Sequence, residues 1–141
     1  MSRVDFYILP DTQRTSQQQF ACKLAEKAWQ QGNRILIQTA SADESHIIDE
    51  LLWTLKQDSF IPHAVLNTSS NDDNPILISH EAANDGQFQL MINLTTTIAE
   101  QDRFERIAEI LNQDEASKQM GREHYKLYRN QGYDLNHHDM S

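Results

Sequence analysis

The stretch VDFYIL, Val4–Leu9, is a short apolar run that ends at Pro10-Asp11 and predicts a buried first strand. Apolar residues then recur at helical spacing over Thr15–Gln31, and Gly32 follows where a glycine commonly ends a helix. The next apolar run, RILIQT at Arg34–Thr39, is rich in β-branched residues and predicts a second strand. Strand, helix and strand at this spacing predict a βαβ unit, and therefore a mainly parallel sheet with helices on both faces.

The same alternation continues along the chain. Ser41-Ala-Asp-Glu44 has the pattern of a capping box and predicts a helix from Ser41 to about Lys56. The elements expected after it are a short strand or loop at Phe60–His63, a polar loop at Thr68–Asn74, strands at Ile76–Ser79 and Gln89–Leu94, helices at Gln101–Asn112 and Ala116–Gln131, and a flexible end. We expect one α/β domain over residues 1–141: a three-layer α/β/α Rossmann-like domain with a mainly parallel sheet and no nucleotide site.

The charge of the chain is acidic but uneven. Its 141 residues include 12 Lys and Arg against 21 Asp and Glu, a net charge of −9. A protein that coats duplex DNA non-specifically needs a net basic surface, so this balance argues against that class. Residues 118–129, however, carry four cations against one glutamate, a net +3, which leaves −12 on the rest. One basic segment on an acidic molecule favours a short, defined ligand over a long polyanion.

The single cysteine, Cys22, stands in a helix-forming run. One thiol cannot form an internal disulfide, so we expect a reducing compartment. No Cys–His signature surrounds it, which favours a packing role over that of a nucleophile. The first apolar run is too short for a signal peptide, and no run reaches the roughly 18–20 residues needed to span a bilayer. These features predict a cytoplasmic protein.

Few residues point to catalysis or to a cofactor. The loop after the first expected strand, Pro10–Ser16, lacks the glycines that let a backbone approach a pyrophosphate, so we expect no cofactor. His80, Glu81 and Asp85 follow an expected strand, where the catalytic groups of a small hydrolase could lie. His137-His138-Asp139 has metal-binding side chains, but a polar terminal stretch is more often flexible, and we expect no metal.

Two surfaces suggest partners, and the first is on the helix expected from Ser41 to Lys56. Its apolar stripe is formed by Ile47, Ile48, Leu51, Leu52 and Leu55. Trp53 falls nearly opposite the centre of this stripe, and Trp is enriched at interface hot spots. Phe60 and Ile61 follow in a polar setting, so we expect an apolar docking site for another chain. The alternatives are that Trp53 packs under a loop, or that Phe60 and Ile61 enter the core.

The second surface lies on the helix expected at Ala116–Gln131. The side expected to face the core carries Met120, His124 and Leu127. The opposite side gathers Lys118, Arg122, Tyr125 and Arg129. Such a stripe suits single-stranded nucleic acid, an acidic peptide or C-terminal carboxylate, or simply solvent. Gly121 and His124 are poor helix formers for positions inside this helix.

Several blocks of the sequence resemble one family. They are FYIL at 6–9, AxxLxxKAWQQGNRILI at 21–37, ELLWT at 50–54 with DSFIPH at 58–63, and REHYKLYRNQGYDLN at 122–136. On these residues the chain resembles the chi subunit of bacterial DNA polymerase III, an accessory protein of the clamp loader. The blocks run through almost the whole chain, and residues 66–84 are the part least like the family.

The resemblance implies a non-enzymatic bridge in DNA replication. Chi-like proteins bind the psi subunit, which tethers them to the clamp loader, and the acidic, apolar-ended C-terminal tail of single-stranded-DNA-binding protein. By motif position, the resemblance assigns psi binding to Trp53 and Phe60, with Ile61 beside them. It assigns tail binding to Lys118, Arg122, Tyr125 and the apolar wall residue Leu111, which Arg129 joins by its place on the helix. The psi surface is shared with an accessory helicase in the family, which implies competing partners.

Two other classes of function stay open. The basic face of residues 118–129 would also serve a direct single-stranded DNA-binding module, and strong oligonucleotide binding without peptide binding would indicate it. A small hydrolase would use His80, Glu81 and Asp85, and loss of a measured activity on their substitution would indicate that class.

Overall fold

The computed structural model describes residues 3–54, 63–65, 75–80, 88–95 and 104–140. The strands in these ranges are β1 (Arg3–Ile8), β2 (Ile35–Gln38), β3 (His63–Val65), β4 (Ile76–Ser79), β5 (Phe88–Asn93), β6 (Phe104–Leu111) and β7 (Asp134–Asp139). The helices are α1 (Arg14–Gln30), α2 (Ala42–Thr54) and α3 (Glu115–Asn130), each within two residues of a predicted one. Of the expected strand or loop at Phe60–His63 only His63 is described, and the loop expected at Thr68–Asn74 lies outside the described residues.

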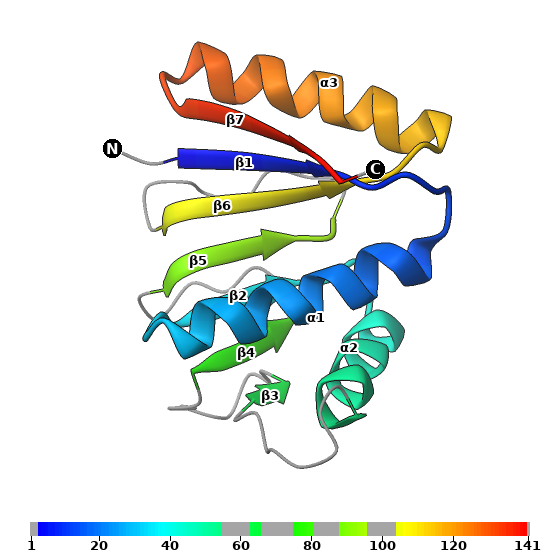
Figure 1. The fold of residues 1–141 in the computed structure, drawn as a ribbon, viewed down its shortest axis with the longest axis vertical. Coiled ribbons are helices and arrows are strands. Elements are labelled where there is room, and N and C mark those ends of the chain that lie inside the picture. The colour runs from blue at the N-terminus through cyan, green and yellow to red at the C-terminus, as the bar shows by residue number, and fades with distance from the viewer. Residues whose placement is uncertain (1–2, 55–62, 66–74, 81–87, 96–103, 141) are drawn as a thin grey trace.

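The described strands form one sheet in the order β3-β4-β2-β5-β6-β1-β7, and every neighbouring pair is parallel. Ala21 and Ala25 of α1 and Ile48 of α2 are buried on one face, whereas Tyr128 of α3 is buried on the other. Figure 1 shows α3 running alongside β7, while α1 lies over the sheet nearer β2 and β4. The predicted three-layer α/β fold with a parallel sheet is confirmed.

Residues 104–111 form a strand, β6, where the sequence pattern predicted a helix over Gln101–Asn112. β6 lies between β5 and β1, and its residues Ile107 and Ala108 are buried on opposite faces of the sheet. A central strand of a parallel sheet is covered on both faces, so its sequence lacks the alternation of polar and apolar residues. In this segment Phe104, Ile107, Ala108 and Leu111 stand at helical spacing with charged residues between them, so periodicity favours a helix, and the helix prediction was wrong.

The end of the chain, predicted to be flexible, forms the edge strand β7, which pairs in parallel with β1. Gly132, with φ +86°, adopts the left-handed conformation that ends α3 and turns the chain toward β7. The backbone N–H of Tyr133 donates to the carbonyl of Tyr128 at 3.2 Å and closes this turn. The side chains of β7 are mostly polar, so the strand depends on its pairing with β1 and not on a local strand signal.

Local signals read from the sequence at α1 and α2 match the structure. The Ser41 hydroxyl accepts a hydrogen bond from the Glu44 N–H at 3.1 Å, and the Glu44 carboxylate accepts one from the Ala40 N–H at 3.0 Å. This is the predicted cap of α2. Cys22 is buried in α1, and burial raises the pKa of its thiol to about 12, so it packs as a neutral side chain. Among the described helices, none combines the length and the apolar character that a membrane span requires.

Candidate functional site

A buried carboxylate in β6 holds α3 against the sheet. Oε1 of Glu109 lies 2.9 Å from Nδ1 of His124, and Oε2 accepts hydrogen bonds from the Tyr128 hydroxyl at 2.9 Å and the Asn93 amide at 2.8 Å. All four side chains are buried. Burial, and then the neighbouring Glu109 carboxylate, raise the pKa of Tyr128, so its hydroxyl stays protonated and donates. Because buried polar groups are costly without partners, this network fixes both the position and the rotation of α3.

Gly121 lets α3 approach β6 closely. A Cβ atom built on Gly121 would lie 2.5 Å from Cδ1 of Leu111, far inside van der Waals contact. The two poor helix formers of this helix therefore have structural roles: Gly121 permits the approach, and His124 contacts Glu109. The Leu111 side chain, which Gly121 contacts, also forms part of the wall of a pocket.

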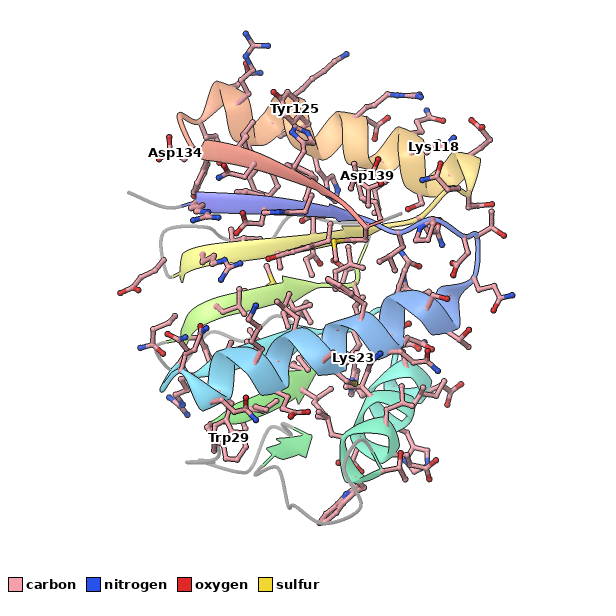
Figure 2. All side chains as sticks on the ribbon, in the orientation of Figure 1. Lys23, Trp29, Lys118, Tyr125, Asp134 and Asp139 are labelled. Carbon is pink, nitrogen blue, oxygen red and sulfur yellow. The ribbon has the colours of Figure 1, made fainter. Side chains whose placement is uncertain are left out.

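A pocket of about 550 Å³ lies between α3 and the strands β1, β6 and β7, and is here named the α3 pocket. Its apolar and aromatic lining includes Phe6, Ile8, Leu111 and Tyr125. The charged residues that line it are all cationic: Lys118, Arg122, Lys126 and Arg129. In the part of the chain that the structure describes, none of these four cations makes an ion pair with an acidic side chain. Figure 2 shows Lys118 and Tyr125 on this helix.

Three rings line the side of the α3 pocket next to the sheet edge. The Tyr125 ring lies 5.8 Å from that of Phe6 and 5.1 Å from that of His137, as centroid distances. His137 and Phe6 stack at 5.5 Å with an interplanar angle of 18°. These contacts hold the partly exposed Tyr125 ring against the sheet, where it offers an apolar surface beside the cations.

The structure brings together the five residues predicted to bind the tail. Lys118, Arg122, Tyr125, Arg129 and Leu111 all line the α3 pocket. Sequence reasoning missed Phe6, Ile8 and His137, because they reach the pocket only through the pairing of β1 with β6 and β7. Lys126 was counted in the charge of the segment but not in the site, although it stands within one helical turn of Arg122 and Arg129.

One residue predicted for the core side of α3 faces solvent. Leu127 is 49% exposed, whereas the next residue, Tyr128, is fully buried and bonds Glu109. The buried network thus rotates the helix so that Tyr128, not Leu127, packs on the sheet. His124 is buried and Met120 partly buried, as expected.

The second predicted surface is described only in part. Trp53 is 55% exposed on α2, as its position on the helical wheel predicted. Phe60, Ile61 and Leu55 lie outside the described residues. The apolar stripe is narrower than expected, because Ile48 and Leu52 are buried while Ile47 is 42% exposed.

The weaker candidates do not assemble into a described site. His80 Nδ1 lies 3.4 Å from the Ser45 hydroxyl, and its proposed companions Glu81 and Asp85 fall outside the described residues. His137 and His138 are consecutive residues of β7 and therefore point to opposite faces of the sheet. The part of the chain that the structure describes holds no group of three or more potential metal ligands.

The chain is similar to proteins of known family over nearly its whole length. Residues 1–136 match the family described as DNA polymerase III chi subunit, HolC. Identity to the DNA polymerase III subunit chi of Pseudomonas aeruginosa is 33% over 139 residues, covering 98% of this chain and 96% of that protein. The protein of the same name from Haemophilus influenzae is 33% identical over 132 residues, with 92% of each covered. The Escherichia coli one is 27% identical over 142 residues, covering 96% and 97%.

Among solved structures, the chain is similar to T4 UvsW with a TM-score of 0.68. The match covers 98% of this chain and 41% of the T4 chain. Sequence identity is 8%, so this similarity concerns the fold alone.

Proposed function

The chain belongs to the DNA polymerase III chi subunit family, and from this we propose that it is a cytoplasmic, non-catalytic subunit that bridges two replication partners. One partner is a psi subunit, which tethers it to the clamp loader. The other is the acidic, apolar-ended C-terminal tail of single-stranded-DNA-binding protein. The observation that carries the proposal is the α3 pocket, with four cations around an apolar and aromatic lining.

The lining of the α3 pocket suits both ends of such a tail. The terminal carboxylate and nearby aspartates would pair with the Lys118 ammonium and the Arg122 guanidinium. A guanidinium can bind a carboxylate through two hydrogen bonds. The last apolar side chain would lie between Tyr125 and Leu111. Truncating either half of the lining should therefore weaken the same ligand.

The charged part of this contact is open to solvent, and that sets its strength. Arg122, Lys126 and Arg129 are exposed, so their attraction to a carboxylate is screened by salt. We expect a modest affinity for one tail, which falls as salt rises. Several tails on one coated strand would restore the overall strength through avidity.

The psi contact is assigned to the other end of the sheet. Trp53 on α2 is the described member of this surface, with Phe60 and Ile61 as its further members. A contact centred on Trp53 would be mainly apolar and less sensitive to salt than the tail contact. An accessory helicase that uses the same surface would exclude psi.

A paired pull-down tests both halves of the bridge. Immobilised single-stranded-DNA-binding protein and immobilised psi are each offered the intact chain and its variants. Arg122→Ala or Tyr125→Ala should abolish capture by the first and leave capture by psi intact, and Trp53→Ala should do the reverse. Asn130→Ala, an exposed change that follows Arg129 on α3 but lies outside the pocket lining, is the matched control. Loss of both captures from one substitution would show that the surfaces are misassigned.

A direct single-stranded DNA-binding module remains the second candidate, because Tyr125 stands among four cations without ion pairs in the described chain. Titration with an oligonucleotide and with an acidic peptide separates the two. Tight oligonucleotide binding that Arg122→Ala abolishes, with no peptide binding, would replace the bridge by this function.

A further inference from the structure

We propose that the opposite face of the sheet carries a second binding site, which takes an acidic peptide segment with a bulky apolar side chain. The site is a pocket of about 310 Å³ between α1, strands β1 and β6, and the end of β7. It is named the α1 pocket below. The inference stands on its own observations and does not depend on the function proposed for the α3 pocket.

The charged residues that line the α1 pocket are again all cationic: Lys23, Lys27 and Arg106. Lys23 and Lys27 are exposed and four residues apart, so they stand on the same side of α1, one turn from each other. Neither makes a hydrogen bond or ion pair in the part of the chain that the structure describes. Figure 2 shows Lys23 on α1, away from the Lys118 and Tyr125 of α3.

Arg106 is held in place by two short hydrogen bonds. Its Nε donates to Oδ2 of the buried Asp5 at 2.6 Å, and its Nη2 donates to the Tyr7 hydroxyl at 2.6 Å. Asp5 is shared with Arg3, whose Nη2 lies 2.9 Å from Oδ1, and with His138, whose Nε2 lies 3.0 Å from the same oxygen. One carboxylate therefore faces two arginines, and cations are in excess along the α1 pocket itself, whose lining holds three of them and no acidic side chain. An anionic ligand would complement that excess.

The apolar lining of the α1 pocket suits an aliphatic or aromatic side chain. It comprises Tyr7, Phe20, Leu24, Ala28 and Met140. Met140 is 44% exposed, which leaves apolar surface open beside the three cations. Carboxylates at the rim and an apolar side chain inside would use both kinds of lining together.

The Tyr7 ring of this lining is not available to stack on a nucleotide base. The Tyr7 ring stacks on His138 at 4.7 Å and contacts Phe20 at 5.1 Å, and its residue is only 7% exposed. It therefore offers no free face to a base, although base stacking is a main source of affinity for single strands. The net charge of −9 further disfavours a long polyanion. A short acidic peptide is the ligand that the charge and the lining favour.

The pleat of β1 explains why the pockets lie back to back. Phe6 and Ile8 of β1 line the α3 pocket, whereas Tyr7 lines the α1 pocket. At the sheet edge, His137 of β7 lines the first and Met140, three residues later, lines the second. Successive side chains of a strand point to opposite faces, so neighbouring residues of β1 line different pockets.

The test is a titration of the full, isotope-labelled chain with the acetylated peptide Asp-Asp-Asp-Phe bearing a free C-terminal carboxylate. Amide resonances of Lys27 and Met140 report on the α1 pocket, and those of Gly121 and Tyr125 report on the α3 pocket. We expect both sets to shift. The double substitution Lys23→Ala, Lys27→Ala should weaken binding at the first set about fivefold to tenfold without changing the second. The charge-conserving pair Lys23→Arg, Lys27→Arg should retain it.

The outcomes separate this inference from the proposed function. Shifts at Gly121 with none at Lys27 and Met140, at saturating peptide, would overturn the α1 site and leave the tail proposal intact. Shifts confined to Lys27 and Met140 would support the α1 site and count against the tail proposal. If a poly-thymidine oligonucleotide bound the Lys27 set more tightly than the peptide, the site would belong to nucleic acid and the inference would be wrong.

Discussion

The two basic pockets lie on opposite faces of the sheet, and each has a buried carboxylate beside it that works in a different way. Glu109, next to the α3 pocket, contacts buried side chains of α3 and β5. Asp5, next to the α1 pocket, contacts side chains of three strands, β1, β6 and β7, and all three reach solvent. The first carboxylate fixes the position of a helix, whereas the second neutralises part of a basic surface. What a buried acidic residue does is thus decided by its partners.

Removal of Glu109 should cost the most stability. Glu109→Ala would remove the carboxylate that His124, Tyr128 and Asn93 share while these side chains stay buried, and we expect the free energy of unfolding to fall by about 3 kcal/mol or more. Urea or thermal unfolding followed by circular dichroism measures it. Glu105→Ala, an exposed change on the same strand, is the control and should stay within about 0.5 kcal/mol. Equal losses in the two variants would show that Glu109 does not anchor α3.

The ion pairs of Asp5 should make the stability of the fold depend on pH. Although burial raises the pKa of its carboxyl, hydrogen bonds from His138, Arg106 and Arg3 hold that pKa below its ordinary value. A lowered folded-state pKa means that the ionised carboxylate stabilises the fold above the unfolded pKa of about 4, and that this contribution is lost as pH falls through the folded pKa. We expect Asp5→Asn to be destabilised by about 1–2 kcal/mol at neutral pH, with the difference shrinking below about pH 4.

Unfolding curves from pH 7 down to about pH 2 measure this effect. Asp134→Asn, at an exposed carboxylate of β7, is the control and should differ from the parent chain by a small amount at every pH. A difference between Asp5→Asn and the parent that stays constant over the whole range would contradict the pairing of Asp5.

Gly121→Ala tests whether the anchoring of α3 shapes its pocket. The new methyl group would lie 2.5 Å from Cδ1 of Leu111 and would push that side chain toward the pocket that it lines. We expect the affinity for an acidic, apolar-ended peptide to fall about tenfold, measured by calorimetry. Stability should change by less than about 1 kcal/mol, because the better helix propensity of alanine offsets part of the clash. Gln119→Ala controls for the substitution itself, and an unchanged affinity would mean that Leu111 yields without affecting the pocket.

Lys126 lines the α3 pocket but is exposed, so its contribution to binding should be small. Lys126→Ala should weaken the same peptide only about two- to fivefold, since exposed ion pairs contribute little. The loss should shrink further as salt is raised, and Lys126→Arg should restore binding. An effect that does not depend on salt would show that Lys126 acts by packing rather than by charge.

The layered fold could be predicted from the sequence because its signals are local. Helical spacing in α1 and the capping box at Ser41 and Glu44 depend only on neighbouring residues. The sequence predicts the grouping of Lys118, Arg122, Tyr125 and Arg129 for the same reason, since residues three or four apart share one face of a helix. What was missed depends on pairing between distant segments. The sequence of β6 has apolar residues at helical spacing, and it forms a strand because it pairs with β5 and β1. β7 is a strand only beside β1. The rotation that buries Tyr128 instead of Leu127 likewise follows from the contact with Glu109 on β6, which a helical-wheel projection of α3 alone does not include.

The edge strand β7 carries a constraint on chain length rather than on residue identity. His137 pairs in register with Phe6 and His138 with Tyr7, so the two histidines serve opposite faces of the sheet. A single residue inserted or deleted in the turn at Gly132 would shift this register by one and exchange the faces of every β7 side chain. Insertions there should therefore disturb both pockets at once, whereas most point substitutions along the strand affect only one.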